Sequence, residues 1–176
     1  MSRVVIFGNS GSGKTSLARQ FSGQAGIPLL DLDSVAWKEA EPPIRESSEK
    51  SLTAIDRFIA QSQSWIIEGC YSSLIAHAAQ NASQMYFLNI GVDACVENCR
   101  SRPWEPDKYA SKEAQDKNLE MLVEWVRTYE TSKDEFSLRE HQRIFEEFRR
   151  TKSEIKSNAE AQYQRMETAS VFCRLF

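Results

Sequence analysis

Glycine is scarce in this sequence: the chain has 176 residues and only seven glycines, against the roughly twelve that average usage would give. Three of the seven, Gly8, Gly11 and Gly13, fall within six consecutive positions directly after a short apolar run. A chain that uses glycine so sparingly does not spend it there on general flexibility. Their concentration therefore indicates a local requirement on the backbone.

Cysteine, histidine and long apolar runs are scarce as well. The four cysteines do not make a disulfide framework, and neither His77 nor His141 lies in a zinc-ligand spacing with a cysteine pair, so we expect free thiols. No run approaches the ~18 apolar residues that a membrane span needs, and the N-terminal apolar stretch is too short for a signal peptide. We therefore expect a cytoplasmic protein with no membrane partner.

An excess of charge of one sign is also lacking, because 22 basic and 25 acidic residues give a net charge of −3. Binding of duplex nucleic acid by counterion release is thus disfavoured. A late basic cluster consists of Arg139, Arg143, Arg149, Arg150, Lys152 and Lys156. Glutamates interleave with it, which is more typical of a salt-bridged helix face than of a nucleic-acid track.

Apolar strand-like runs alternate with helical patterns along the chain. Strand candidates span residues 4–7, 27–33, 65–67, 85–90 and, more weakly, 152–157; helical patterns span 14–25, 45–61, 93–102 with Asp93 as cap, a long segment around 119–126, and 137–148. Strands separated by helices predict a parallel sheet covered on both faces. The sequence predicts one α/β domain over residues 1–176, with a helical excursion after the fourth strand.

The clustered glycines belong to a phosphate-binding motif. Residues 8–15 match G-x-x-x-x-G-K-[ST] between a strand and a helix, the context that the motif requires. Glycines let successive backbone N–H groups converge on phosphate, the Lys14 ammonium reaches the β- and γ-phosphates, and the Thr15 hydroxyl supplies a Mg²⁺ ligand. The motif predicts an ATP and Mg²⁺ site formed by Gly8, Asn9, Ser10, Gly11, Ser12, Gly13, Lys14, Thr15 and Ser16.

With this loop, the chain resembles the small P-loop kinases of the adenylate and shikimate kinase type, and among them the adenylate-kinase-related DNA topology modulation proteins. The resemblance covers roughly residues 3–158 and rests on the loop, on residues 27–37 and 65–71, and on Arg100-Ser-Arg102. It implies a three-layer α/β/α P-loop fold with a mostly parallel five-stranded sheet. It also implies acceptor-site helices at about 34–63 and a helical lid at about 102–135 after strand four.

The resemblance also implies roles for individual residues. Asp33 would lie on the acceptor side, Asp31 near Mg²⁺, and Glu68 would hold Mg²⁺ through water. Arg100 and Arg102 would neutralise charge on the moving phosphoryl group at the base of the lid. The alternatives are a strand-end cap and turn for the two aspartates, and a solvated helix end for the two arginines.

Four further side chains and one glycine bear on the acceptor pocket. Trp37 and Tyr71 follow the two acidic strand ends, and we expect them to line that pocket together with Gly69; core packing is the alternative for both aromatic residues. Arg45 and Arg57 are placed on the helix over the acceptor site. A solvated helix face is favoured for them over binding of an anionic acceptor.

The acceptor itself does not follow from the resemblance. The chain has Glu68-Gly-Cys-Tyr-Ser where adenylate kinases carry Asp-Gly-Phe-Pro-Arg, and it lacks the triple glycine of shikimate kinases. We therefore predict ATP-dependent phosphoryl transfer to a small-molecule or nucleotide acceptor. The alternative is a regulatory or nucleic-acid-associated P-loop ATPase with slow hydrolysis. The sequence does not specify an oligomeric state. The apolar residues 171–176 could dock on the rest of the domain or on a partner chain.

Overall fold

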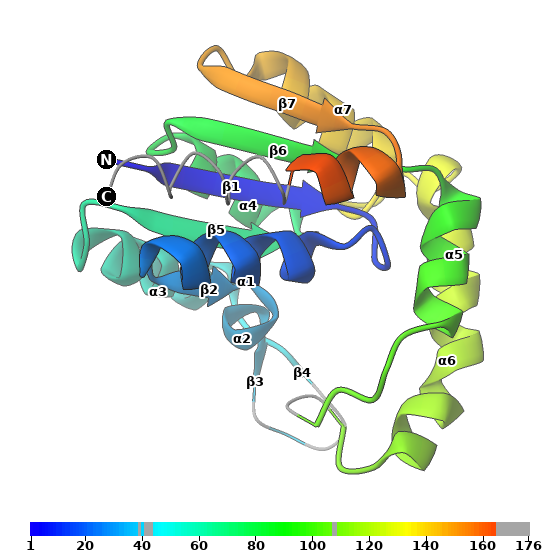
Figure 1. Cartoon of the computed structure of the whole chain (residues 1–176). Coiled ribbons are helices and arrows are strands. Elements are labelled where there is room, and N and C mark those ends of the chain that lie inside the picture. The colour runs from blue at the N-terminus through cyan, green and yellow to red at the C-terminus, as the bar shows by residue number, and fades with distance from the viewer. Residues whose placement is uncertain (39, 41–43, 107–108, 165–176) are drawn as a thin grey trace.

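The computed structural model describes residues 1–38, 40, 44–106 and 109–164. Its main sheet has five strands: β1 (Arg3–Gly8), β2 (Leu29–Asp31), β5 (Trp65–Gly69), β6 (Gln84–Leu88) and β7 (Thr151–Ile155). Their spatial order is β2-β5-β1-β6-β7, and every pair of neighbours is parallel (Figure 1). All five carboxyl ends therefore meet at one edge of the sheet.

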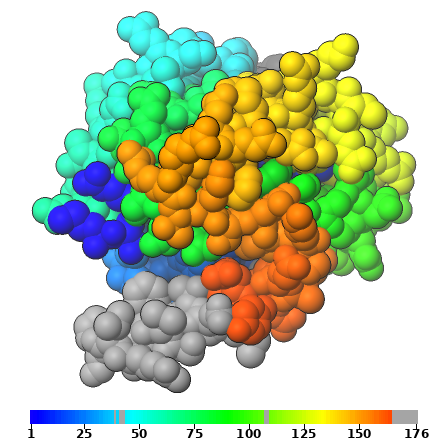
Figure 2. All heavy atoms as spheres, turned by 90° about the horizontal axis from the view of Figure 1, so that it is seen from above, coloured from blue at the N-terminus to red at the C-terminus, as the bar shows by residue number. Residues whose placement is uncertain are grey.

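Helices cover both faces of this sheet. One face carries α1 (Lys14–Ala25) and the helical residues 158–164; the other carries α3 (Ser48–Ala60), α4 (Ser72–Ala79) and α7 (Leu138–Glu147) (Figure 1). The space-filling view shows β7 at the surface, with the start of that last helical segment beside it (Figure 2). The three-layer α/β/α prediction is confirmed.

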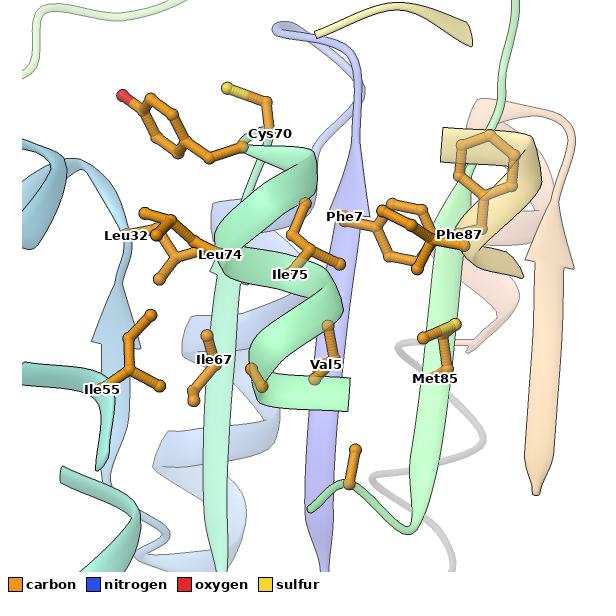
Figure 3. Packing of buried hydrophobic residues seen from close by; sticks show 14 of the residues in the cluster. Val5, Phe7, Leu32, Ile55, Ile67, Cys70, Leu74, Ile75, Met85 and Phe87 are labelled. Carbon is orange, nitrogen blue, oxygen red and sulfur yellow. The ribbon is translucent and has the colours of Figure 1, made fainter. Parts of the chain in front are cut away.

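The strands divide their side chains between two apolar clusters. On β1, Val5 and Phe7 face the α4 side, whereas Val4 and Ile6 pack towards α1, as the twofold alternation of a strand requires. Figure 3 shows the first of these clusters, in which Phe7 and Phe87 lie parallel with ring centroids 4.9 Å apart. Both faces of the sheet are thus shielded from water, which explains why its strands are continuous apolar runs and do not alternate between apolar and polar residues.

The remaining elements lie at the carboxyl edge of the sheet. A helical excursion after β6 consists of α5 (Val92–Arg100), α6 (Lys112–Arg127) and the 3₁₀ turn η1 (Thr128–Glu130). On the other side of that edge, α2 (Asp33–Ala36) leads into a small antiparallel pair, β3 (Trp37–Lys38) and β4 (Ile44–Arg45). These two arms project from the body in Figure 1.

Three predicted boundaries are wrong for local reasons. The second strand ends at Asp31 rather than Asp33, because the Asp31 side chain accepts a hydrogen bond from the Asp33 N–H (2.9 Å) and turns the chain into α2. Ser47 caps α3, so that helix begins at Ser48 and Arg45 lies on β4 instead. Gly91, with φ of 88°, precedes α5, so Asp93 lies in the first turn and is not the cap.

Elements that the sequence did not predict are short. The helix α4 has eight residues, and β3 and β4 have two residues each. The predicted thiol state is confirmed for Cys70, Cys95 and Cys99, which are buried and free. Cys173 and residues 171–176 lie outside the described part of the chain. Within that part, no helix combines the length and apolar character needed to cross a membrane.

His141 joins α7 to the end of β5. The side chain is fully buried; its Nε2 donates to the Cys70 carbonyl oxygen (2.9 Å), and Nδ1 accepts from the Tyr129 hydroxyl (2.8 Å). A carbonyl only accepts, so the contact with Cys70 requires a proton on Nε2. Burial lowers the pKa of His141 to about 4, so the ring is neutral at pH 7 and Nδ1 accepts from the Tyr129 hydroxyl.

We predict that this buried histidine makes the protein acid-sensitive. Its folded pKa is about 4, so the unfolded chain binds the proton first, near its ordinary pKa of about 6.5. The free energy of unfolding should therefore fall by about 3 kcal/mol between pH 6.5 and pH 4 on this account alone. Urea unfolding measured across this range should show that the free energy of unfolding depends less steeply on pH in His141→Gln than in wild type. Equal pH dependence in the two proteins would contradict the prediction.

Candidate active site

The phosphate loop joins β1 to α1 and has the backbone that only glycine adopts readily. Gly8, Gly11 and Gly13 have φ values of 148°, 78° and 91°. A β-carbon on Gly8 would lie 2.3 Å from the Leu88 carbonyl oxygen, and one on Gly11 would lie 2.3 Å from the Cys95 carbonyl oxygen. The predicted local requirement is thus twofold: a left-handed backbone, and close approach to β6 and α5.

Two asparagines anchor this loop to the helical excursion. The Asn98 amide on α5 donates to the Gly11 carbonyl oxygen (2.8 Å), and the Asn9 amide donates to the Val126 carbonyl oxygen on α6 (3.1 Å). The Lys14 ammonium, which is buried, donates to the Asn9 carbonyl oxygen (2.8 Å). These contacts therefore hold the loop in its conformation, and the Lys14 ammonium is hydrogen-bonded to a backbone carbonyl of the loop itself.

Glu68 lies at the end of β5, directly beside the loop. Its side chain is buried, and its Oε1 accepts a hydrogen bond from the Thr15 hydroxyl (2.6 Å). Burial raises the pKa of Glu68 above its usual range; the charge of Lys14 and the bond from Thr15 oppose that rise. Two of the three predicted metal-binding side chains, Thr15 and Glu68, are therefore in direct contact.

The fit of a Mg²⁺ ion can be judged from these donors. A hydroxyl and a carboxylate are hard oxygen ligands, which Mg²⁺ prefers. Over residues 1–38, 40, 44–106 and 109–164, no three His, Cys, Asp or Glu side chains form a metal-binding group. Mg²⁺ keeps several waters and binds proteins through few side chains plus substrate phosphates. Thr15 and Glu68 fit such an ion.

Asp31 and Asp33 lie one strand further along the same edge. Asp31 is the register partner of Glu68 across β2 and β5, which brings the two acids to neighbouring strand ends. Asp33 lies in the first turn of α2, and its Oδ1 accepts a hydrogen bond from the Tyr71 hydroxyl (2.7 Å). Asp31 thus also has the capping role that the sequence left as the alternative.

The two predicted arginines are placed differently. Arg102 lines the cavity and pairs with Glu105 (2.9 Å), and both side chains are largely covered. Arg100 points instead to α6, where its guanidinium lies 3.9 Å from Glu120 on the surface. Arg100 is the last residue of α5 and Arg102 lies beyond it, so the two side chains lie in different directions. The structure therefore does not bring Arg100 to the cavity.

The predicted substrate residues also divide. Gly69 lines the cavity, and a β-carbon there would lie 2.8 Å from the Leu32 side chain, so glycine is needed for packing at this point. Trp37 and Tyr71 are not among the cavity-lining residues. Tyr71 is buried and contacts Asp33 through its hydroxyl, and Trp37 contacts Tyr71.

One cavity of about 810 Å³ unites most of these groups. Its lining includes residues 10–16 of the phosphate loop, Asp31, Asp33, Glu68, Gly69 and Arg102. Gly8 and Asn9 of the predicted set are not in this lining; they shape the loop from behind through the contacts described above. Cations and anions thus face one another across a space large enough for a nucleotide and an acceptor.

Sequence reasoning missed several residues of this cavity. Asn98, Ser101, Trp104, Leu122 and Gln162 line it, and Asn158 does so while exchanging two hydrogen bonds with Asn98 (3.0 and 3.1 Å). The pair joins α5 to the residues that follow β7. No motif marks these positions, because their proximity arises only when the excursion and the C-terminal helical residues fold back onto the loop.

No protein-family model matches the chain, and no curated protein matches it. Solved structures do. A gluconokinase from Sinorhizobium meliloti 1021 is 18% identical over 99% of this chain and 93% of that one, with a TM-score of 0.52. The shikimate kinase from Acinetobacter baumannii in complex with shikimate is 12% identical over 99% and 95%, with a TM-score of 0.54. A shikimate kinase from Bacteroides thetaiotaomicron is 14% identical over 97% of both chains, with a TM-score of 0.54.

These similarities establish the fold. The chain shares its three-layer α/β/α fold with these gluconokinase and shikimate kinase structures. At such low identities no substrate carries over. The resemblance to DNA topology modulation proteins is not tested by these structures and stays a prediction.

We predict that Gly11→Ala disables the loop. The new β-carbon would meet the Cys95 carbonyl oxygen at 2.3 Å at a φ of +78°, so we expect a loss of about 1–3 kcal/mol in the free energy of unfolding and a fall of at least about tenfold in ATP affinity. The matched control is Gly23→Ala in α1, where a β-carbon meets nothing within 4 Å; it should stabilise by roughly 0.5–1 kcal/mol. Urea unfolding and ATP titration measure both. Unchanged ATP affinity in Gly11→Ala would overturn the loop assignment.

Proposed function

We propose that this protein is an ATP-dependent phosphotransferase acting on a small-molecule or nucleotide acceptor. The observation that carries the proposal is the shared cavity, in which the phosphate loop faces Asp31 and Asp33 with Glu68 between them. A phosphate donor and a hydroxyl or phosphate acceptor have to meet in line, with cations around the transferred group. The cavity offers both halves of that arrangement. The likeness in fold to gluconokinase and shikimate kinase structures is consistent with it.

Bound ATP would supply the transferable phosphoryl group, and Mg²⁺ held near Thr15 and Glu68 would offset its charge. The chain's own contribution begins with Lys14. Its ammonium now rests on the Asn9 carbonyl oxygen, a neutral partner that it can exchange for phosphate oxygens at little cost. Successive N–H groups of the loop and the start of α1 add fixed positive dipoles aimed at the same anion.

On the acceptor side, Asp33 is the proposed residue that binds and orients the attacking group. Its carboxylate lines the cavity and is held by Tyr71. A carboxylate in this position accepts a hydrogen bond from an acceptor hydroxyl and directs its lone pair towards the donor phosphate. Arg102 is the proposed cation on the lid side, and its pairing with Glu105 must loosen for it to reach the phosphates.

The region at about 102–135 is the proposed lid, and residues 1–176 the proposed single domain. Closing α6 and the loop before it over the cavity would exclude water, which otherwise competes for the phosphoryl group. Asn9 and Asn98 connect the phosphate loop to α6 and α5. A movement of these helices would therefore move the loop, and a change in the loop on nucleotide binding would move the helices.

We do not propose nucleic-acid binding, because the late basic cluster is largely satisfied within the chain. Arg143 pairs with Glu140 and Glu147 (3.0 and 2.9 Å), and Lys156 pairs with Glu154 (3.2 Å). Arg150 and Lys152 donate to backbone carbonyl oxygens. Such groups gain little from phosphate unless they give up these partners.

We predict that Lys14→Ala lowers ATP turnover on the order of 100-fold or more, because a preorganised cation is lost from the charge that develops during transfer. Thermal unfolding should show that the fold survives. The control is Lys50→Ala, an exposed lysine of α3 whose nearest acid is 3.9 Å away. An ADP-release assay on both variants measures the effect. Equal turnover in Lys14→Ala and wild type would falsify the ATP-site assignment.

We predict that Asp33→Asn separates the two halves of the reaction. Transfer to the acceptor should fall by a factor of roughly 100 or more, while ATP affinity changes less than about threefold. The assay is ADP release above background hydrolysis, screened over nucleoside monophosphates, sugars and other small hydroxyl compounds. Asp56→Asn, an exposed aspartate of α3, is the matched control. If Asp33→Asn lost ATP binding and transfer equally, Asp33 would belong to the metal side instead.

A further inference from the structure

We propose that Tyr71 and Trp37 form a hydrogen-bonded relay that fixes the orientation of the Asp33 carboxylate, which makes Tyr71 a positioning residue for the acceptor side of the site. The inference rests on the proposed role of Asp33 in phosphoryl transfer. It assigns Tyr71 and Trp37 a different role from the lining of the acceptor pocket that the sequence suggests.

The direction of each hydrogen bond in the relay is determined by chemistry. The Trp37 indole Nε1 lies 2.6 Å from the Tyr71 hydroxyl oxygen, and that oxygen lies 2.7 Å from Asp33 Oδ1. An indole N–H only donates, so the tyrosine oxygen accepts from Trp37. Its own proton then points to the carboxylate, which accepts. The chain Trp37→Tyr71→Asp33 therefore has one sense.

The tyrosine ring is clamped from several sides. The Arg45 guanidinium carbon lies 4.2 Å above its centroid, and the Phe136 ring packs edge-on at 5.3 Å. Only 3% of Tyr71 is exposed. A ring held by a cation on its face and an aromatic edge keeps its hydroxyl in one place. Asp33 therefore receives its hydrogen bond from a fixed point.

The small strand pair supplies two of these contacts at once. Trp37 on β3 and Arg45 on β4 are register partners, so one hairpin delivers the indole N–H to the hydroxyl and the guanidinium to the ring. Arg45 is itself held by Glu135 (2.9 Å), which also accepts from the Ser73 hydroxyl (2.8 Å). The relay thus joins the hairpin, the start of α4 and the segment before α7 to the acid in α2.

The protonation state of Tyr71 suits this role. Burial and the neighbouring Asp33 charge raise its pKa above its usual range, so the phenol keeps its proton at all working pH values. A permanent donor stabilises the ionised carboxylate and fixes its plane. Asp33 lines the cavity, whereas Tyr71 and Trp37 are not among its lining residues. Their hydrogen bonds to each other and to Asp33 therefore give them a way to act on the acceptor side of the site.

A kinetic test uses Tyr71→Phe, which removes the hydroxyl and keeps the ring under Arg45. The kcat for acceptor-dependent transfer should fall by about 10- to 100-fold, as expected for a misplaced reacting group, with the KM for ATP within about twofold of wild type. Trp37→Phe should show a smaller loss of the same kind. The control is Tyr86→Phe on β6, whose hydroxyl donates to Gln84 Oε1 at 3.5 Å; its kinetics should match wild type.

A double variant separates positioning from a general structural defect. If Tyr71 acts through Asp33, Tyr71→Phe combined with Asp33→Asn should lose no more kcat than Asp33→Asn alone. Independent effects would multiply, and multiplied losses would overturn the proposal. So would a wild-type kcat in Tyr71→Phe.

A second readout needs no substrate, which keeps this proposal separable from the proposed function. In ligand-free protein, Asp33→Asn should shift the ¹⁵N–¹H indole signal of Trp37, assigned by its disappearance in Trp37→Phe. The same substitution in a Tyr71→Phe background should leave that signal unmoved, with the Trp65 indole as internal reference. A shift that persists without the hydroxyl, or no shift at all, overturns the relay. If the relay holds but no acceptor supports ATP consumption in wild type, the proposed function fails while Tyr71 still positions Asp33.

Discussion

The site depends on the parallel pairing of β5 between β1 and β2. Glu68 is the register partner of Ile6 on one side and of Asp31 on the other. The strand that carries the buried acid therefore also sets the distance of Glu68 from the phosphate loop and from Asp31. A slip of one residue would turn Glu68 to the opposite face. The apolar side chains on both faces of these strands prevent it, because every one of them would have to exchange clusters.

The same pairing places charge where water is excluded. Glu68 and Lys14 are 2% and 8% exposed, and burial raises the pKa of such an acid. The Thr15 hydroxyl and the Lys14 ammonium oppose that rise in its pKa. Buried opposite charges of this kind add little to stability compared with an apolar replacement. Their retention at a cavity is better understood as preparation for a ligand that brings its own charges, which is the case for a metal–nucleotide complex.

Local signals in the sequence predicted the fold and the phosphate loop. Apolar runs separated by helical patterns are sufficient for a parallel sheet, and Gly8 to Thr15 specify a backbone that needs no tertiary context to be recognised. Two of the three boundaries that failed depend on single side chains: Asp31 ends β2, and Ser47 rather than Arg45 starts the next helix. The pair β3–β4 could not be predicted, because strands of two residues have no periodicity.

Candidate site residues followed the same division. Those adjacent to a strand end in the sequence, Asp31, Asp33, Glu68 and Gly69, all reach one cavity, because strand ends converge in a parallel sheet. Arg100 does not reach it, because its side chain lies towards Glu120 on α6, whereas Arg102, two residues further along the chain, lines the cavity. The contact between Asn98 and Asn158 could not be predicted from the sequence, because sixty positions separate the two residues and only the folded excursion brings them together.

The three cavity acids at the sheet edge, Asp31, Asp33 and Glu68, are held by three different contacts. Asp31 is held by the turn that it makes itself, Glu68 by the phosphate loop through Thr15, and Asp33 by a side chain from the next strand connection. Glu68 is therefore coupled to the phosphate loop, and Asp33 to the hairpin that carries Trp37 and Arg45. In a chain built in this way, a change in the hairpin or in Tyr71 alters the surroundings of Asp33 while the contacts that hold the phosphate loop stay intact.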